Sequence, residues 1–318
     1  MTHGYVRPLS GRVRRRRNAL LGAALGALVL GTAVTGCAAG SSAAARGAGA
    51  PSSGPGAPAS PLSASLSPSP SANTANPANT ADASDAWARW GLKPLAPAPE
   101  PPAVKPVELT AHGPVPVISN VPTKEKIVFI TIDDGQEKSP DFVRMLGDLK
   151  VPVTMFLTND AIKSDYGYFA QLQGLGNHVQ NHTLHHPDMT RLSPARQRAE
   201  ICGNQEVLTQ RYGTAPLLFR PPYGAGAYAD SLGAAVRQCG PRAIVLWRES
   251  MQIKQMQYQT ADKRLRPGDI ILAHFRGPAE LKGVTMTHMF ANMLRHIREQ
   301  GFTVARLEDY IQAPPAAQ

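Results

Sequence analysis

A buried parallel strand is predicted by the run Ile127-Val128-Phe129-Ile130-Thr131-Ile132-Asp133-Asp134. Its first six residues are almost continuously apolar and rich in β-branched side chains, as in strands that are covered on both faces of a sheet. Two adjacent carboxylates then end the run. We therefore expect an α/β fold in which both acids lie at the carboxyl end of a buried strand.

Helical patterns and further apolar runs alternate after this strand. Ser139-Pro140-Asp141 supplies an N-cap residue, a proline at the first helical position and a first-turn acid, and predicts a helix to about Leu149. Ser193-Pro194 begins a longer helix that should end at Gly213. Further strands are expected at 153–157, 217–219, 243–247, 269–273 and 302–304, with helices near 228–238 and 286–299. This alternation indicates βαβ units and a parallel sheet.

The number of these units favours a barrel over an open sheet. About seven units in the ordered region predict an incomplete or distorted (β/α) barrel, with an open doubly wound sheet as the alternative. No glycine-rich phosphate loop follows the first strand, so the sequence gives no support for nucleotide binding.

Composition divides the 318 residues into three parts. Of the 29 prolines, 15 lie between Cys37 and Pro116, in a region that is also rich in Ala, Ser and Gly. Such sequence has little to bury and cannot offset its ordering entropy. We expect a signal segment at 1–37, a low-complexity tether at 38–118 and a single folded domain at 119–318. One island in the tether, which contains Trp87 and Trp90, could dock on the domain, bind the cell wall or form an unattached helix.

The net charge of +10 is concentrated near the amino terminus, because residues 1–37 hold six arginines and no acid. Only +4 remains on residues 119–318, so the basic balance indicates targeting rather than nucleic-acid binding. Five of these arginines precede an uncharged stretch that ends in Val34-Thr35-Gly36-Cys37. This pattern resembles a bacterial lipoprotein signal with Cys37 as the lipidated residue; an uncleaved membrane-anchor helix is the alternative. We expect an exported chain that is lipid-anchored to the outer face of the membrane, or secreted. Cys202 and Cys239 would then either pair or remain free thiols.

Polar residues end several of the apolar runs, where the strands of a barrel would converge on one face. His182 and His186 are four residues apart, so they could share one side of a helical turn and bind one metal ion. Asp134 would add a carboxylate ligand and leave a position for water, which is the arrangement of a hydrolytic metal site. Asp133 would remain free to act as a general base.

Four short motifs together resemble the polysaccharide deacetylases, the NodB-homology enzymes of carbohydrate esterase family 4. They are Thr131-Ile132-Asp133-Asp134-Gly135, His182-Thr183-Leu184-His185-His186, Arg220-Pro221-Pro222-Tyr223-Gly224 and Ile271-Leu272-Ala273-His274. The resemblance covers about residues 120–312 and implies a distorted (β/α) barrel that removes N- or O-acetyl groups from sugars.

The resemblance also implies a role for each matching residue. Asp133 would be the general base, and Asp134, His182 and His186 would bind one divalent metal, for which zinc is the first choice and cobalt, nickel or manganese are alternatives. Arg220 would complete the catalytic set, Tyr223 would hold the oxyanion through its backbone N–H, and His274 would be the general acid. Leu272, Pro222 and Trp247 would line the substrate pocket.

The fourth motif departs from the family pattern. The family usually has an aspartate shortly after the strand that bears Trp247, and this acid orients the motif arginine. Here Glu249 is the only nearby acid, and it is the candidate partner of Arg220. We therefore expect a monomeric, metal-dependent deacetylase of an acetylated cell-wall or extracellular glycan, such as peptidoglycan or a chitin-like polymer. The alternative is a non-catalytic glycan-binding lipoprotein that retains the barrel.

Overall fold

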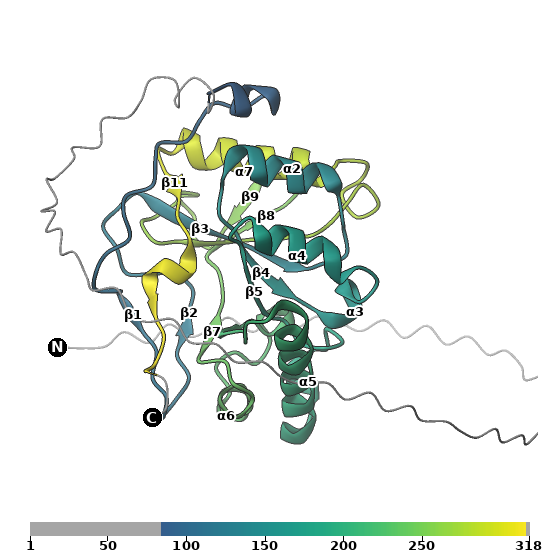
Figure 1. The fold of residues 1–318 in the computed structure, drawn as a ribbon. Coiled ribbons are helices and arrows are strands. Elements are labelled where there is room, and N and C mark those ends of the chain that lie inside the picture. The colour runs from purple at the N-terminus through teal and green to yellow at the C-terminus, as the bar shows by residue number, and fades with distance from the viewer. Residues whose placement is uncertain (1–83, 316–318) are drawn as a thin grey trace, which may run out of the picture. The chain divides into compact units, whose positions relative to one another are not determined.

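The computed structural model describes residues 84–315, and these form one α/β unit (Figure 1). A ten-stranded sheet has the order β2-β7-β6-β5-β4-β3-β10-β8-β9, with β11 also paired to β3. All of its strand pairs are parallel except the β8–β9 hairpin. The strand predicted from 127 onward is β3, at the centre of the sheet, and all eight of its residues are buried.

The elements follow the predicted alternation closely. The strands are β1 (Val107–Glu108), β2 (Val117–Ile118), β3 (Ile127–Asp134), β4 (Thr154–Leu157), β5 (His178–Asn181), β6 (Leu218–Phe219), β7 (Ala243–Val245), β8 (Glu249–Met251), β9 (Met256–Tyr258), β10 (Ile270–His274), β11 (Thr303–Val304) and β12 (Ile311–Gln312). The α-helices are α2 (Pro140–Leu149), α3 (Asn159–Ile162), α4 (Tyr166–Gly174), α5 (Pro194–Tyr212), α6 (Asp230–Cys239) and α7 (Met286–Glu299). Short 3-10 turns are η1 (Met189–Arg191), η2 (Pro222–Gly224) and η3 (Leu307–Tyr310).

The sheet curls into an incomplete barrel. Just after the edge strand β2, Asn120 forms an antiparallel bridge with Asp269, directly before β10. The backbone N–H of Val121 also donates a hydrogen bond of 2.8 Å to the carbonyl of Gly268. The β2 edge of the sheet is therefore drawn toward the start of β10, and the prediction of an incomplete (β/α) barrel is confirmed over the open sheet.

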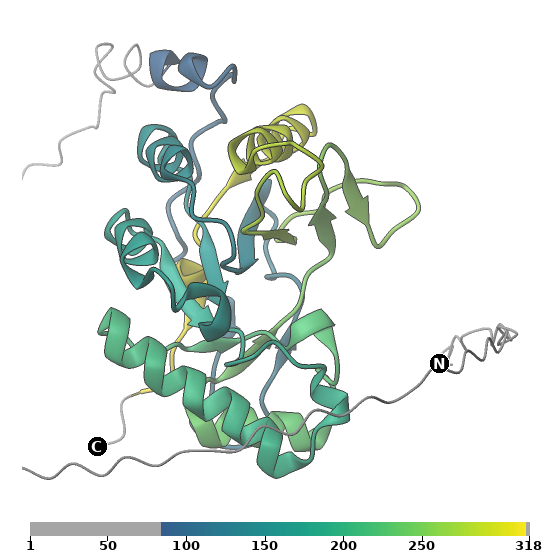
Figure 2. The same ribbon diagram turned by 90° about the vertical axis from the view of Figure 1, so that its right-hand side faces the viewer.

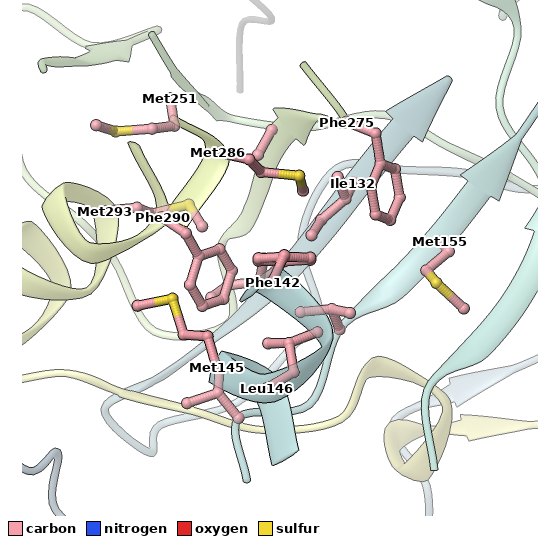
Figure 3. Packing of buried hydrophobic residues seen from close by; sticks show 14 of the residues in the cluster. Ile132, Phe142, Met145, Leu146, Met155, Met251, Phe275, Met286, Phe290 and Met293 are labelled. Atoms are coloured by element: carbon pink, nitrogen blue, oxygen red, sulfur yellow. The ribbon is translucent and has the colours of Figure 1, made fainter. Parts of the chain in front are cut away.

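Helices cover the outer face of the curled sheet. Alternate residues of β3, such as Ile130 and Ile132, pack against Phe142 of α2 and Phe290 of α7 (Figure 3). The rings of Phe142 and Phe290 meet edge to face with centroids 5.1 Å apart. Truncating either ring to alanine should cost about 3–5 kcal/mol of folding free energy. The other face of β3 contributes Ile127 and Phe129 to a second apolar cluster, inside the curl.

The predicted tether was wrong for its last part, because residues 84–118 pack on the domain. Residues 84–89 are helical, and Trp87 is only 8% exposed within the cluster that α2 and α7 build. The indole N–H of Trp90 donates a 2.9 Å hydrogen bond to Asp148. Further on, β1 pairs with β12 near the carboxyl terminus (Figure 1). The tryptophan island therefore docks on the domain. Its apolar side chains are buried against the domain, because the surrounding proline-rich sequence offers them no apolar partner.

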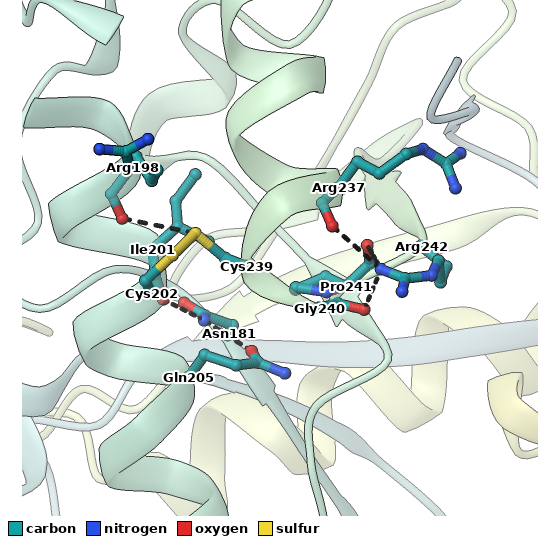
Figure 4. The surroundings of a disulfide bond; sticks show 10 residues. All are labelled: Asn181, Arg198, Ile201, Cys202, Gln205, Arg237, Cys239, Gly240, Pro241 and Arg242. Atoms are coloured by element: carbon teal, nitrogen blue, oxygen red, sulfur yellow. Dashed lines mark hydrogen bonds between the residues drawn. A yellow bond between two sulfur atoms is a disulfide. The ribbon is translucent and has the colours of Figure 1, made fainter. Parts of the chain in front are cut away.

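Cys202 and Cys239 form a disulfide that joins α5 to α6 (Figure 4). Their Cα atoms lie 4.6 Å apart. The two helices pack side by side along one flank of the barrel (Figure 2). Of the two alternatives that the sequence left open, pairing is therefore the one found.

Two expectations for the amino-terminal region lie outside the described residues, namely the signal segment and the lipidation of Cys37. Within residues 84–315, no helix combines the length and the apolar character needed to cross a membrane.

Candidate active site

The register of the parallel strands brings the predicted site residues to one edge of the sheet. Asp133 lies opposite His274 in the β3–β10 ladder, and Asp134 lies opposite Leu157 of β4. His182 directly follows Asn181, which is the last residue of β5. Arg220 likewise follows β6. Carboxyl ends of barrel strands meet on one face, so residues from distant parts of the sequence converge there.

Asp134, His182 and His186 form a compact group whose ligand atoms all lie within 4.8 Å of one another. The Nε2 atom of His186 is 3.1 Å from Asp134 Oδ1, and that of His182 is 3.5 Å from the same oxygen. Although the Asp134 carboxylate is buried, its Oδ1 accepts no hydrogen bond from any described residue. Two imidazole nitrogens and an orphaned carboxylate oxygen thus face a common point.

Backbone strain accompanies this convergence. Among the described residues, seven non-glycine residues have positive φ, and four of them, Asp134, Thr183, His186 and Tyr223, belong to the site. Such conformations are costly and persist where the surrounding structure enforces them, which is common at functional sites. At Asp134, φ is 75°, and its carboxylate lies with that of Asp133 beside His182, with oxygens 3.5 and 3.6 Å from His182 Nε2.

The two histidines do not share a helical turn, so that part of the sequence prediction was wrong. Residues 182–188 form a loop after β5, and positive φ angles at Thr183 and His186 fold it back on itself. Asn181 braces the loop, because its Oδ1 accepts the Thr183 N–H at 3.0 Å and an amide hydrogen of Asn204 at 3.0 Å. Spacing in sequence could not reveal this, since the loop depends on a partner from α5.

His182 is held from two sides. Its Nδ1 lies 2.7 Å from the backbone carbonyl of Arg220, and because a carbonyl only accepts, Nδ1 carries the hydrogen. The hydroxyl of Thr158 donates to the His182 carbonyl at 2.8 Å. Nε2 is therefore the nitrogen that faces Asp134, in the orientation that metal-binding imidazoles acquire from a second hydrogen bond.

The carboxylates and imidazoles of this group shift each other's pKa values. Burial acts to raise the pKa of Asp134, but the neighbouring imidazoles outweigh it and hold that pKa well below its ordinary value. Burial acts to lower the pKa of His182, but the carboxylates of Asp133 and Asp134 outweigh it and raise that pKa. The two carboxylates thus place enough negative charge beside the imidazoles to attract a cation.

Arg220 holds Asp133 inside the barrel. Its guanidinium is fully buried and lies over the ring of Phe156, with 4.2 Å between the guanidinium carbon and the ring centroid. Nη1 donates to Asp133 Oδ1 at 2.6 Å and to the hydroxyl of Thr131 at 2.9 Å, while Nε donates to the carbonyl of Val245. The carboxylate of Asp133 is thereby fixed beside the histidine pair, 3.6 Å from His182 Nε2.

His274 completes the group at the end of β10. Burial lowers its pKa below the ordinary histidine value, against the opposing effect of Asp133 and Asp134. Leu272 is buried two residues earlier in the same strand. His274 and Leu272 thus lie on the same face of β10.

The Arg220-Pro221-Pro222-Tyr223-Gly224 segment forms a tight turn against the histidines. The side chain of Tyr223 is 71% exposed and meets His186 edge to face, with ring centroids 4.9 Å apart. Pro222 is buried, and Trp247 is half-buried. The Trp247 ring contacts Arg220, with 5.5 Å between its centroid and the guanidinium carbon. Trp247 therefore supports the arginine in addition to being a candidate pocket residue.

Glu249 does not pair with Arg220, which corrects the expectation for the fourth motif. No oxygen of Glu249 lies within 4 Å of that guanidinium; the neighbour of Glu249 is Asp269 instead. Burial and the Asp269 carboxylate raise the pKa of Glu249 to about 8. Arg220 needs no further acid, because Asp133, Thr131 and two backbone carbonyls already receive its hydrogens.

Sequence reasoning missed Arg276. Its Nη2 atom lies 3.8 Å from Asp134 Oδ2, and its side chain remains 43% exposed. The only signal was its place two residues after His274, at the end of the same strand. Thr131, Asn181 and Asn204 were also missed as braces, because each acts through a hydrogen bond that the linear pattern does not display.

Comparison with known proteins agrees with this geometry. Residues 120–244 match the family model described as polysaccharide deacetylase. An uncharacterised Streptomyces coelicolor protein, SCO4760, is 40% identical over 197 residues, which is 62% of this chain and 77% of that protein. The peptidoglycan-N-acetylmuramic acid deacetylase PdaA of Bacillus subtilis is 27% identical over 199 residues, with 59% and 72% of the two chains covered.

Solved structures share the fold. The Bc1960 peptidoglycan N-acetylglucosamine deacetylase superposes with a TM-score of 0.53 at 22% identity, over 63% of this chain and 94% of that one. A carbohydrate esterase family 4 pseudoenzyme, BA3943 from Bacillus anthracis, gives 0.51 at 19% identity, over 62% and 70%. With the incomplete barrel, the four motifs at its open end and the family match all in agreement, this chain belongs to the polysaccharide deacetylase family.

Proposed function

We propose that this protein is a metal-dependent hydrolase that removes acetyl groups from the sugars of a cell-wall glycan. The observation that carries the proposal is the meeting of Asp134, His182 and His186 beside a buried, arginine-held Asp133. Two imidazoles and one carboxylate suit a divalent cation, with zinc as the first choice and cobalt, nickel or manganese as alternatives. Once bound, such an ion supplies Lewis acidity for water activation and for charge on the acetyl oxygen.

The protein's own residues then divide the proton transfers. Asp133 takes a proton from the attacking water, because Arg220 fixes its carboxylate and leaves the second oxygen toward His182. His274, on the neighbouring strand, gives a proton to the leaving nitrogen or oxygen of the sugar. Tyr223 offers its backbone N–H to the developing oxyanion. Leu272, with Pro222 and Trp247 nearby, receives the acetyl methyl group.

The substrate class follows from the relatives' names and from the expected location. Proteins similar to this one are named deacetylases of peptidoglycan N-acetylmuramic acid and of peptidoglycan N-acetylglucosamine, and another is named a chitooligosaccharide deacetylase. We propose an acetylated glycan of the peptidoglycan or chitin type, acted on by a monomer that is exported and lipid-anchored through Cys37. The disulfide between α5 and α6 supports export, because such bonds persist in oxidising compartments.

A non-catalytic glycan-binding role is the competing proposal, and one fold neighbour is described as a pseudoenzyme. Its sequence argument was the altered fourth motif. That argument weakens here, because Arg220 and Asp133 pair without Glu249.

The decisive experiment measures acetate release from peptidoglycan glycan strands, chitotetraose and acetyl-xylan, before and after chelation and after readdition of Zn²⁺. We expect release from at least one N-acetylated glycan that stops with chelator and returns with zinc. Binding of these glycans without acetate release under any metal would favour the non-catalytic role.

A further inference from the structure

A cavity adjoins the proposed active site on the side of His274. It has a volume of about 640 Å³ and lies between the β8–β9 turn and the segment that precedes α7. His274 and Arg276 line it, whereas Asp134, His182 and His186 do not. This volume is within the range of ordinary ligand sites, so the space can hold a part of the substrate beyond the reacting acetyl group.

The floor of the cavity is apolar and the rim is cationic. Met251, Leu281 and Met289 are buried beneath it. Lys254 and Lys282 are exposed at its edges, on the two segments that enclose it. An apolar floor with charged groups only at the rim suits a ligand that has both a hydrocarbon surface and a charge.

The positive charge at this rim is not neutralised within the protein. Neither Lys254 nor Lys282 forms a salt bridge or a side-chain hydrogen bond with any residue in 84–315. The carboxylate of Glu280, the one acid in the lining, accepts the Gly277 N–H at 3.1 Å. Among residues 84–315, Arg276 forms one ion pair, with Asp134 at 3.8 Å. Because Arg276 faces Asp134, the two lysines are the cations left without a partner here, and they outnumber the single acid Glu280, so the rim can attract an anion.

We infer that this cavity binds a carboxylate on the glycan next to the sugar that is deacetylated. This inference rests on the proposed deacetylase function and narrows its substrate to acetylated glycans that carry carboxylates. In peptidoglycan, a free carboxylate occurs on the lactyl group of a muramic acid residue that carries no stem peptide, and on the stem peptide itself. The lysines receive the carboxylate, and the apolar floor packs against the hydrocarbon part of the same group.

The test compares a double variant, Lys254→Gln/Lys282→Gln, with a matched control, Lys124→Gln/Lys126→Gln. The control removes the same charge from exposed positions just before the amino end of β3, away from the cavity. Arg276 is left intact because it contacts Asp134. The substrates are peptidoglycan glycan strands freed of stem peptides, the same strands with their carboxylates amidated, and chitotetraose.

We expect the double variant of the full-length protein to raise KM for the charged strands about fivefold to tenfold, the effect of losing two exposed ion pairs. Its kcat should hardly change, because a remote charge binds ground state and transition state alike. Activity on amidated strands and on chitotetraose should change less than twofold. Strands that keep their stems locate the carboxylate, because the stem occupies the lactyl carboxyl as an amide. A higher KM for these strands than for freed strands places the recognised carboxylate on the lactyl group, and an equal or lower KM places it on the peptide.

Two outcomes overturn the inference: an equal loss on charged and neutral glycans, or an equal loss in the control variant. A binding measurement separates this failure from failure of the proposed function. In an Asp133→Asn background, calorimetry should still show tighter binding of charged than of amidated strands, and Lys254→Gln/Lys282→Gln should abolish the difference. Absence of that difference refutes the carboxylate site, whether or not the wild-type protein releases acetate.

Discussion

Asp133 and His274 are direct partners in the parallel ladder between β3 and β10, so two neighbouring strands present the proposed base and acid side by side. Their spacing is therefore set by the sheet rather than by a loop. A rigid spacing suits two proton transfers that must occur on opposite sides of one reacting bond.

We predict that Asp133→Asn and His274→Ala each lower kcat by about 10²–10⁴-fold, the usual effect of a positioned proton-transfer group. Metal content should not change, because neither residue belongs to the ligand group. In the pH profile of kcat/KM, Asp133→Asn should remove the acidic limb and His274→Ala the basic limb. Since burial lowers the pKa of His274, the proton it donates is lost as pH rises through a value below 6.5.

His288→Ala is the matched control for His274, because His288 is an exposed histidine on α7. If His274 only closed its strand, His274→Ala would lower the melting temperature and leave kcat within a few-fold of wild type. Measuring both quantities on one metal-loaded preparation distinguishes these roles.

We predict that the wild-type protein binds one divalent metal per chain and that His182→Ala/His186→Ala loses it while remaining folded. The loop that bears both histidines contributes little to the apolar clusters, so the barrel should survive. His185→Ala should keep the metal, since His185 is exposed and directed at Glu200. Elemental analysis with circular dichroism checks this, and unchanged metal in the double variant would refute the assignment.

We predict that Glu249→Gln stabilises the protein in mildly alkaline solution. The folded state holds the Glu249 proton up to a pKa of about 8, whereas the unfolded chain releases it near 4.5. Stability is therefore fully present below pH 4.5 and decreases as pH rises toward 8. Glutamine mimics the protonated acid, so the variant should gain at least about 1 kcal/mol at pH 8 and little at pH 5.

Urea unfolding at both pH values measures this effect, with the exposed Glu206→Gln as control. Parallel pH dependence in wild type and Glu249→Gln would show that Glu249 ionises normally.

We predict that the Cys202–Cys239 disulfide contributes about 3–4 kcal/mol to stability, from the chain entropy of a 37-residue separation. Cys202→Ala/Cys239→Ala should unfold at lower urea, and dithiothreitol should shift wild type to the same midpoint without affecting the variant. A variant as stable as oxidised wild type would mean that packing of α5 on α6 suffices.

We predict that Cys37→Ser prevents lipid attachment, so that the protein is released from membranes or accumulates as an uncleaved precursor. The basis is the Val34-Thr35-Gly36-Cys37 pattern after a basic segment and an uncharged stretch. Fractionation with metabolic lipid labelling checks it. Processing and membrane retention equal to wild type would point to a different anchor.

The sequence predicted the barrel because local patterns and global topology agree in this chain. The apolar run at 127–132 could only be a buried strand, and Pro194 and Gly213 mark the bounds of α5 with residues that suit those positions. The packing of residues 84–118 was not predicted as a whole, for the opposite reason, although docking of the island with Trp87 and Trp90 was one of the alternatives that the sequence left open. A segment rich in proline and alanine reads as unstructured, and its few apolar anchors, such as Trp87 and Leu92, gain a partner only after the barrel exists.

At the site, residue identity was easier to predict than connectivity. The sequence allowed the three ligands to be grouped, because only a few types of side chain bind metal ions. These ligands are Asp134, His182 and His186. Proximity in sequence suggested the wrong partner for Arg220. The arginine pairs with Asp133, which is distant in sequence, whereas the nearer Glu249 lies beside Asp269.

Arg220 orients two functional groups with different parts of one residue, His182 through its backbone carbonyl and Asp133 through its guanidinium. The positions of the His182 imidazole and the Asp133 carboxylate therefore both depend on Arg220. A substitution or displacement at this one position disturbs the imidazole and the carboxylate at the same time. Lysine at this position would keep the carbonyl and the charge but lose the planar fork that reaches Asp133, Thr131 and Val245 together. A single amino acid thus joins the proposed metal ligand His182 to the proposed base Asp133.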